Sequence, residues 1–278
     1  MRVVPGTGPG IVAVATVHAE SEELAALLSF DQLNGTPTAP VVRVNYPLFK
    51  YTKYRDPRGS DGTDPDRLSG VEGKRGLQLK YGEVLVKMSG DSGVLLYADV
   101  EVQVPAGLGP GMLKNHVGPI TGQNLDGTLT FLADSGDIDL SKVSGLIRIK
   151  TGSGDVTVEG SGAGWLNVGT GRGDVKVEHF SGEQILCGVV QGSVTLRASA
   201  SRSVSVTVSS GDVVAEVMDV EEFASHVGSG DVLFESPGAR LRKVSCDVGS
   251  GDVVVEPGTG ASVEVPSPQT PVKTPSVP

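Results

Sequence analysis

A four-residue motif, most often Ser-Gly-Asp-Val, returns seven times between residues 135 and 253, with small variations. Its third positions are Asp137, Asp155, Asp174, Ser193, Asp212, Asp231 and Asp252, which lie 18, 19, 19, 19, 19 and 21 residues apart. A fixed period near 19 residues is typical of a solenoid, in which each repeat is one coil that cannot bury its apolar face alone. The motif therefore predicts a stack of short, similar coils.

Apolar residues recur at fixed offsets from the third position of the motif: eight and six residues before it, and one and three residues after it. In the coil of Asp155 they are Ile147, Ile149, Val156 and Val158. The intervening positions are mostly polar, so each coil should contain two short strands whose alternate residues point inward. We expect an all-β chain that forms a right-handed parallel β-solenoid of about eight coils.

The period defines the expected domain organisation. Residues 1–108 do not follow it and are predicted to form an N-terminal β-rich domain that caps the solenoid, with a mobile loop at 50–76. Residues 109–256 form the solenoid repeat domain, and residues 257–278 are expected to be a Pro-rich disordered tail. The other local predictions for the first domain are strands at Ile11–Val17, Val41–Asn45, Leu77–Val86 and Val94–Val104, a helix at Ser21–Leu28 with Ser21 as its N-cap, and a turn at Asn34-Gly35.

Charge and composition limit the classes of partner. The formal net charge is −10, which argues against a nucleic acid or an anionic membrane as partner. No apolar run approaches membrane-spanning length, and the apolar segment Ile11–Ala19 fits a first strand better than a secretory signal. We expect a soluble protein, cytoplasmic by default, that needs no cofactor.

The six aspartates of the motif invite two interpretations. In the structural one, glycine allows a positive φ at the corner, and the Asp carboxylate accepts a hydrogen bond from a nearby backbone N–H. In the functional one, the column of carboxylates binds calcium, which would relieve the repulsion between like charges. The Gly-Gly-x-Gly-x-Asp pattern of calcium-binding repeats is missing, so the structural interpretation is favoured and no metal site is predicted.

Other reactive residue types carry no catalytic pattern. The four histidines lack metal-ligand spacing, and Arg172-Gly173-Asp174 is in register with its sibling turns rather than a separate recognition motif. Cys187 and Cys246 both fall on the inward position six residues before the turn, which predicts small core residues rather than nucleophiles. The position four residues after the third position of the motif forms an acidic row of Glu159, Glu178, Glu216, Glu235 and Glu256. The favoured role of this row is to keep the protein soluble, and the alternative is that it binds a basic partner.

The position two residues after the turn changes character along the chain. It is polar in four coils and then apolar in the last three, in the order Asp139, Thr157, Lys176, Thr195, Val214, Leu233 and Val254. Exposed apolar side chains in register usually mark a contact. We take Val214, Leu233 and Val254 as a candidate interaction surface, and their coverage by the chain's own N-terminal domain or tail is the alternative.

The series of turns, preceded by Val100–Pro105 (VEVQVP) and Ala106-Gly107, resembles the bacterial adhesin-like family of β-strand repeats. That family is a domain of unknown function, and the resemblance covers roughly residues 80–256. It implies a repeated β fold without assigned chemistry. The coils are also similar, more distantly, to bactofilins, which polymerise end to end.

These patterns favour a non-enzymatic binding or structural scaffold that presents a solenoid surface to a protein or glycan partner, as a monomer or weak homodimer. Two alternatives stay open: a carbohydrate-active enzyme of the solenoid type, whose site would assemble from different coils, and a self-assembling bactofilin-like scaffold.

Overall fold

The computed structural model describes residues 1–33, 41–55, 77–81, 83–89, 92–238, 240–257 and 261–264. The chain divides into two compact units, Met1–Pro105 and Ala106–Pro278. The expected Asn34-Gly35 turn and most of the expected loop at 50–76 lie outside the described residues.

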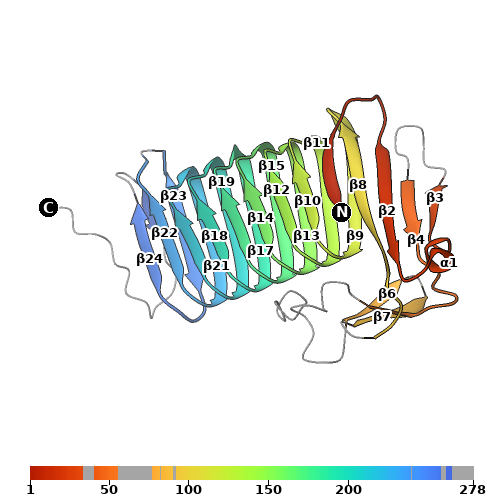
Figure 1. Cartoon of the computed structure of the whole chain (residues 1–278). Coiled ribbons are helices and arrows are strands. Elements are labelled where there is room, and N and C mark those ends of the chain that lie inside the picture. The colour runs from red at the N-terminus through yellow and green to blue at the C-terminus, as the bar shows by residue number, and fades with distance from the viewer. Residues whose placement is uncertain are drawn as a thin grey trace. The chain divides into compact units, whose positions relative to one another are not determined.

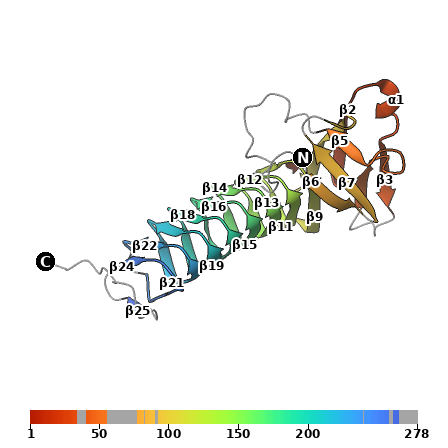
Figure 2. The same cartoon turned by 90° about the horizontal axis from the view of Figure 1, so that it is seen from below.

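The second unit is the predicted parallel β-solenoid of about eight coils, seen from two directions in Figures 1 and 2. Its short strands lie side by side in one sheet, in the order β10 (Ile120–Gln123), β12 (Ile138–Ser141), β14 (Val156–Glu159), β16 (Val175–Glu178), β18 (Val194–Arg197), β20 (Val213–Glu216), β22 (Val232–Ser236) and β24 (Val253–Pro257). Its longer strands form a second sheet in the order β9 (Leu108–Val117), β11 (Asp126–Ser135), β13 (Ser144–Ser153), β15 (Gly162–Arg172), β17 (Ser181–Gln191), β19 (Ala200–Ser210), β21 (Asp219–Ser229), β23 (Lys243–Val248) and β25 (Ser262–Glu264).

The core of the solenoid lies between the two sheets. The residue directly after each turn is at most 1% exposed in every coil, from Ile120 and Ile138 to Val253. The three other predicted inward positions are buried as well, including Cys187 and Cys246. Burial of each Val, Leu or Ile side chain contributes about 1.5–3 kcal/mol, so the repeating core is the main source of stability. The predicted inward alternation is therefore confirmed.

The strand before each turn is longer than the sequence pattern predicts. It spans 10 or 11 residues in most coils, for example in β13 and β17, where a short strand was expected. Its extra length adds a further inward position, four residues before the third position of the motif. Thr151 and Thr170 occupy that position, and each buried hydroxyl donates to the backbone carbonyls of the turn, Thr170 to Gly154 O at 3.2 Å. The five other coils place a buried alanine or valine there, so the apolar signal was present in the sequence and was overlooked: Ala133, Val189, Val208, Val227 and Val248.

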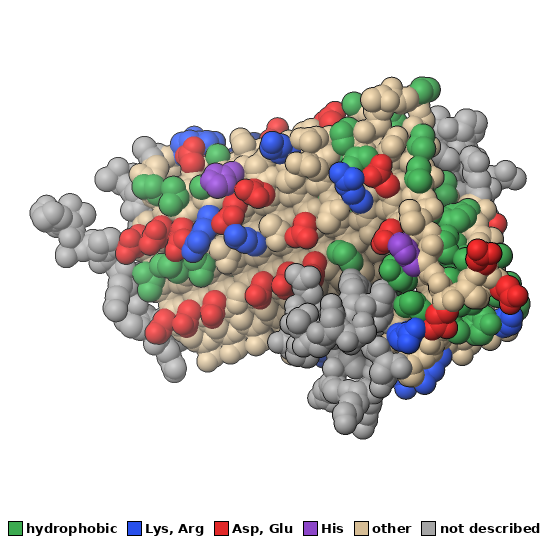
Figure 3. All heavy atoms as spheres, viewed as in Figure 1, with side chains coloured by type: hydrophobic (Ala, Val, Ile, Leu, Met, Phe, Trp, Pro, Cys, Tyr) green, Lys and Arg blue, Asp and Glu red, His purple; other side chains and the backbone are tan. Residues whose placement is uncertain are grey.

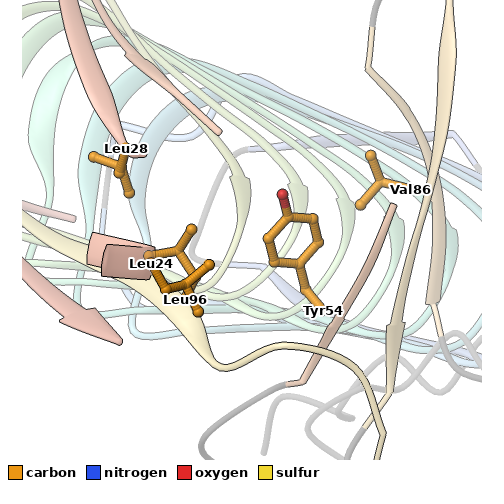
Figure 4. Packing of buried hydrophobic residues seen from close by; sticks show 5 residues of the cluster. All are labelled: Leu24, Leu28, Tyr54, Val86 and Leu96. Carbon is orange, nitrogen blue, oxygen red and sulfur yellow. The ribbon is translucent and has the colours of Figure 1, made fainter. Parts of the chain in front are cut away.

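The first unit is also mostly β. Its strands are β1 (Arg2–Gly6), β2 (Val12–Ala19), β3 (Ser29–Leu33), β4 (Val41–Asn45), β5 (Lys53–Arg55), β6 (Leu77–Tyr81), β7 (Val84–Ser89) and β8 (Leu96–Pro105). β8 pairs in parallel with β1 and antiparallel with β2, while β7 pairs with β5 and β6. A separate small core gathers Leu24, Leu28, Tyr54, Val86 and Leu96, shown as sticks in Figure 4.

Three local predictions for this unit need correction. The segment Leu77–Val86, expected as one strand, folds back on itself as the antiparallel pair β6 and β7. Helix α1 spans only Glu22–Ala25, although Ser21 is its N-cap as predicted and accepts a hydrogen bond from Leu24 N at 3.2 Å. Lys53–Arg55, placed in the mobile loop, form β5 because they pair with β7.

The end of the chain departs from the expected tail at one place. Ser262–Glu264, predicted to be disordered, form β25 and pair in parallel with Lys243–Ser245 of β23. Residues 258–260 and 265–278 lie outside the described residues. Among the residues that are described, no helix has the length and apolar character to cross a membrane.

Candidate functional site

The first corner of each coil contains the glycine of the motif. Gly211 has a φ of +135°, a conformation that side-chain-bearing residues rarely adopt. A Cβ placed there would overlap the carbonyl oxygen of Gly192 and lie 2.6 Å from its carbonyl carbon, because the corners of successive coils stack directly on one another. Glycine is therefore required twice, by the backbone conformation and by the close approach of the preceding coil.

The motif aspartates form a ladder of hydrogen bonds along this corner. Asp137 Oδ1 accepts from Asp155 N at 2.9 Å, and Asp155 Oδ1 accepts from Asp174 N at 2.8 Å. In the same way Asp212 Oδ1 accepts from Asp231 N, and Asp231 Oδ1 accepts from Asp252 N, at 2.8 Å each. One carboxylate oxygen of each of these four acceptor aspartates, Asp137, Asp155, Asp212 and Asp231, thus binds the backbone of the next coil.

Serine replaces aspartate once and keeps the ladder continuous. Ser193 N donates to Asp174 Oδ1 at 2.7 Å, and Ser193 Oγ accepts from Asp212 N at 3.2 Å. The position therefore requires a short side chain with a hydrogen-bond acceptor and does not require a negative charge. Within the described ranges, no group of three or more His, Cys, Asp or Glu side chains is arranged to hold a metal ion.

A second corner, present in six of the coils, was not predicted from the sequence. Five residues after the third position of the motif, the backbone turns with φ between +47° and +56°, at Asn124, Lys142, Gly160, His179, Ala198 and Val217. Its N–H bonds to the neighbouring coil, as in His179 N to Arg197 O at 3.1 Å. Asn and Gly at one shared offset were the available signal, because both tolerate this conformation, but the four other residue types obscured it.

The candidate interaction surface lies on the outer face of the sheet of short strands. Val214 pairs in register with Leu233, and Leu233 with Val254, so the three side chains form one apolar strip across β20, β22 and β24. Each side chain is half-buried by its neighbours while its outer part faces away from the core. The structure thus brings these three predicted residues together as one continuous feature.

Two acidic rows border the apolar strip. Asp212, Asp231 and Asp252 lie two residues before its members, and Glu216, Glu235 and Glu256 lie two residues after them. Figure 3 shows hydrophobic side chains between these two rows at the far end of the solenoid from β10. The alternation of a strand places the glutamate row on the same face of the sheet as the apolar strip, and the aspartate row lies at the corner just before each strand begins.

Both acidic rows are interrupted in the same coil. Ser193 replaces the aspartate and Arg197 replaces the glutamate on either side of Thr195 in the coil of β18. Arg197 Nε forms an ion pair with Glu216 Oε2 at 2.8 Å. Glu235 and Glu256 stand directly opposite each other, and no ion pair to either of them occurs among the described residues. Negative charge therefore accumulates beside the last coils.

The cysteines and histidines occupy positions that suit a structural role. Both cysteines are free and buried, and burial raises the pKa of the Cys187 thiol to about 12 and also raises the pKa of Cys246. Neither is suited to act as a nucleophile, because the thiolate is the reactive form. Three of the histidines pair with a carboxylate: His18 with Asp99, His116 with Asp134 and His226 with Asp247.

Comparison with known proteins gives one match. A family model described as Toastrack DUF4097 matches residues 99–231, which include most coils of the solenoid. No curated protein and no solved structure matches the chain. The match supports a repeated β domain of unknown function and gives no support to an adhesin label. Over residues 99–231 the chain is thus similar to the Toastrack DUF4097 family.

Proposed function

We propose that this chain is a non-enzymatic binding scaffold that presents the outer face of its short-strand sheet to a protein partner. The apolar strip of Val214, Leu233 and Val254 carries this proposal. Polar residues occupy the equivalent positions of the four preceding coils, so the fold itself does not require apolar side chains there. Three apolar residues in register, at a place where the scaffold accepts Thr or Lys, are typical of a contact surface.

The fold and the family match support the same reading. A solenoid repeats one backbone geometry and offers an extended, regular face, which is how repeat proteins bind other macromolecules. The matched domain has no assigned activity. The motif aspartates and the two cysteines are the most reactive side chains of the repeat. The aspartates take part in the hydrogen-bond ladder, and the cysteines are buried in the core.

Site-specific photo-cross-linking in the source cells tests this function. A photoreactive amino acid replaces Leu233 in one variant and Thr157 in a control variant, since both positions are two residues after the turn on the same face. We expect a discrete adduct with another protein at position 233 and not at 157. Identical adduct patterns at both positions, or an adduct only with a second copy of the chain, would overturn the proposed protein partner.

A further inference from the structure

We propose that the apolar strip binds a basic amphipathic α-helix of the partner, lying along the solenoid axis, with Lys or Arg residues on both sides of its apolar stripe. This inference rests on the proposed binding function and names the chemistry of the partner. It draws on the spacing of the strip and on the charge of its two borders.

The spacing of the three apolar side chains matches a helix. Neighbouring strands lie ~4.8 Å apart, so Val214 and Val254 are separated by two steps, or ~9.6 Å along the axis. On a helix, apolar residues at i, i+3 or i+4, and i+7 span ~10.5 Å, because the rise is ~1.5 Å per residue. Three same-face residues of an extended strand span ~13 Å, so an extended segment loses register with the strip.

The charges that border the strip determine the flanks of the partner helix. The glutamate row lies two residues further along each strand than the strip, ~6.6 Å away, and the aspartate row lies at the corner on the other side of the strip. Glu235 and Glu256 are opposed in register, and like charges directly opposite each other destabilise a sheet. Lys or Arg side chains on both flanks of a docked helix would reach these rows and relieve that repulsion, while the apolar stripe covers Leu233.

The preceding coils explain why the site is confined to the last three. Thr195 ends the apolar strip, and Ser193 and Arg197 end both acidic rows in the same coil. Lys176, one coil earlier, adds a second positive charge and pairs with Glu178 at 2.9 Å. A basic helix that extended over β16 and β18 would meet Lys176 and Arg197. The site therefore accommodates about two to three helical turns.

Two synthetic peptides of identical Leu, Lys and Ala composition test the helix assignment. Both have about 18 residues, enough for a helix to be induced on binding. One places Leu at i, i+3 and i+7 with Lys on both flanks, and the other alternates Leu and Lys with the period of a strand. Binding of each labelled peptide to the purified full chain is measured by fluorescence anisotropy. We expect the helical pattern to bind about tenfold more tightly, because only its apolar stripe stays in register with the strip.

Two sets of variants assign the contact. In one set, Thr replaces Val214, Leu233 and Val254, because Thr is the natural residue at the equivalent positions 157 and 195. This change should lower the affinity for the helical peptide about tenfold and leave the circular dichroism spectrum unchanged. Replacement of Glu235 and Glu256 by Gln should reduce both affinity and its dependence on salt. The matched control, Glu159→Gln with Glu178→Gln, should leave binding of the helical peptide unchanged.

The outcomes separate this inference from the proposed function. If the alternating peptide binds as tightly as the helical one and depends on the same three residues, the helix is wrong while a binding face remains. If the strip variants leave both peptides unaffected, the strip is not where a basic helix docks, and this inference fails. The photo-cross-linking result at position 233 then decides the broader function independently.

Discussion

The two kinds of corner in the solenoid both turn the chain with a positive φ but place different demands on the sequence. Both use a positive φ, for example +135° at Gly211 and +54° at Val217. At the first corner a Cβ would overlap the backbone of the preceding coil, and glycine is present in every repeat. At the second corner a Cβ at Gly160 would meet only Lys142 Cγ, at 4.0 Å, and six different residue types occur.

This difference shows what makes a repeat visible in a sequence. A positive φ alone disfavours most residues by about 1–2 kcal/mol, which a stable stack of coils tolerates. A positive φ combined with a backbone contact excludes every side chain. Only the first corner therefore leaves a periodic glycine, although both corners recur with the same period.

The largest effect is expected from a methyl group at the first corner. Gly211→Ala adds a Cβ that collides with Gly192 and forces an unfavourable φ, so we expect a loss of about 3 kcal/mol or more in the free energy of unfolding. Chemical denaturation with urea measures it. Gly188→Ala is the matched control: it lies on the exposed face of β17 with no atom within 4 Å of the added Cβ, and should be neutral or slightly stabilising. Equal losses at both glycines would mean that the first corner does not require glycine more than an ordinary strand position does.

Replacing the β-branched residue at the second corner should increase the stability of the protein. Val217 combines a φ of +54° with a side chain that disfavours this conformation, and Gly160 shows that glycine fits the equivalent position. We expect Val217→Gly to stabilise the protein by about 1 kcal/mol, as relief of backbone strain exceeds the added chain entropy. The thermal midpoint and the urea midpoint should both rise. A fall in both midpoints would mean that the exposed Val217 side chain makes a stabilising contact.

The aspartate ladder of the first corner should depend on an acceptor and not on charge. Asp212→Ala removes the acceptor of Asp231 N, and because the site is exposed we expect a loss of about 0.5–1 kcal/mol. Asp212→Ser should retain most of the stability, since Ser193 Oγ makes the same bond in the preceding coil. Urea denaturation of both variants distinguishes them, and a serine variant as unstable as the alanine variant would contradict the ladder.

Calcium should have the smallest effect on this corner. The five motif aspartates before Asp252 already accept a backbone N–H from the next coil, as Asp155 and Asp231 do. A ligand that binds only the native state raises the thermal midpoint. Because we expect no calcium to bind here, melting curves in millimolar calcium and in chelator should superimpose. A calcium-dependent rise that disappears in Asp231→Asn would assign a metal site to the aspartate column.

Much of the solenoid was predictable because equivalent residues have the same surroundings in every coil. The positions beside each turn, such as Val156 and Val158, meet the same core in every coil, so alternation and period identified them without coordinates. The apolar strip was also predictable, since Leu233 and its neighbours share one offset from the turn. The inward position of Thr151 and Thr170 was missed, although the five other coils place a buried alanine or valine there. Only the structure shows why threonine fits this position: its hydroxyl donates to the carbonyls of the turn.

The sequence by itself determined the β-solenoid, its period and the inward positions, because glycine and apolar residues at fixed offsets leave one way to stack the coils. Only the tertiary structure decided what the motif aspartates bind, since the amide that Asp212 accepts lies 19 residues away in the next coil. The tertiary structure alone also decided the second corner and the small core around Tyr54. These features depend on which residues distant in the chain come into contact, and the period alone does not name the two atoms that meet.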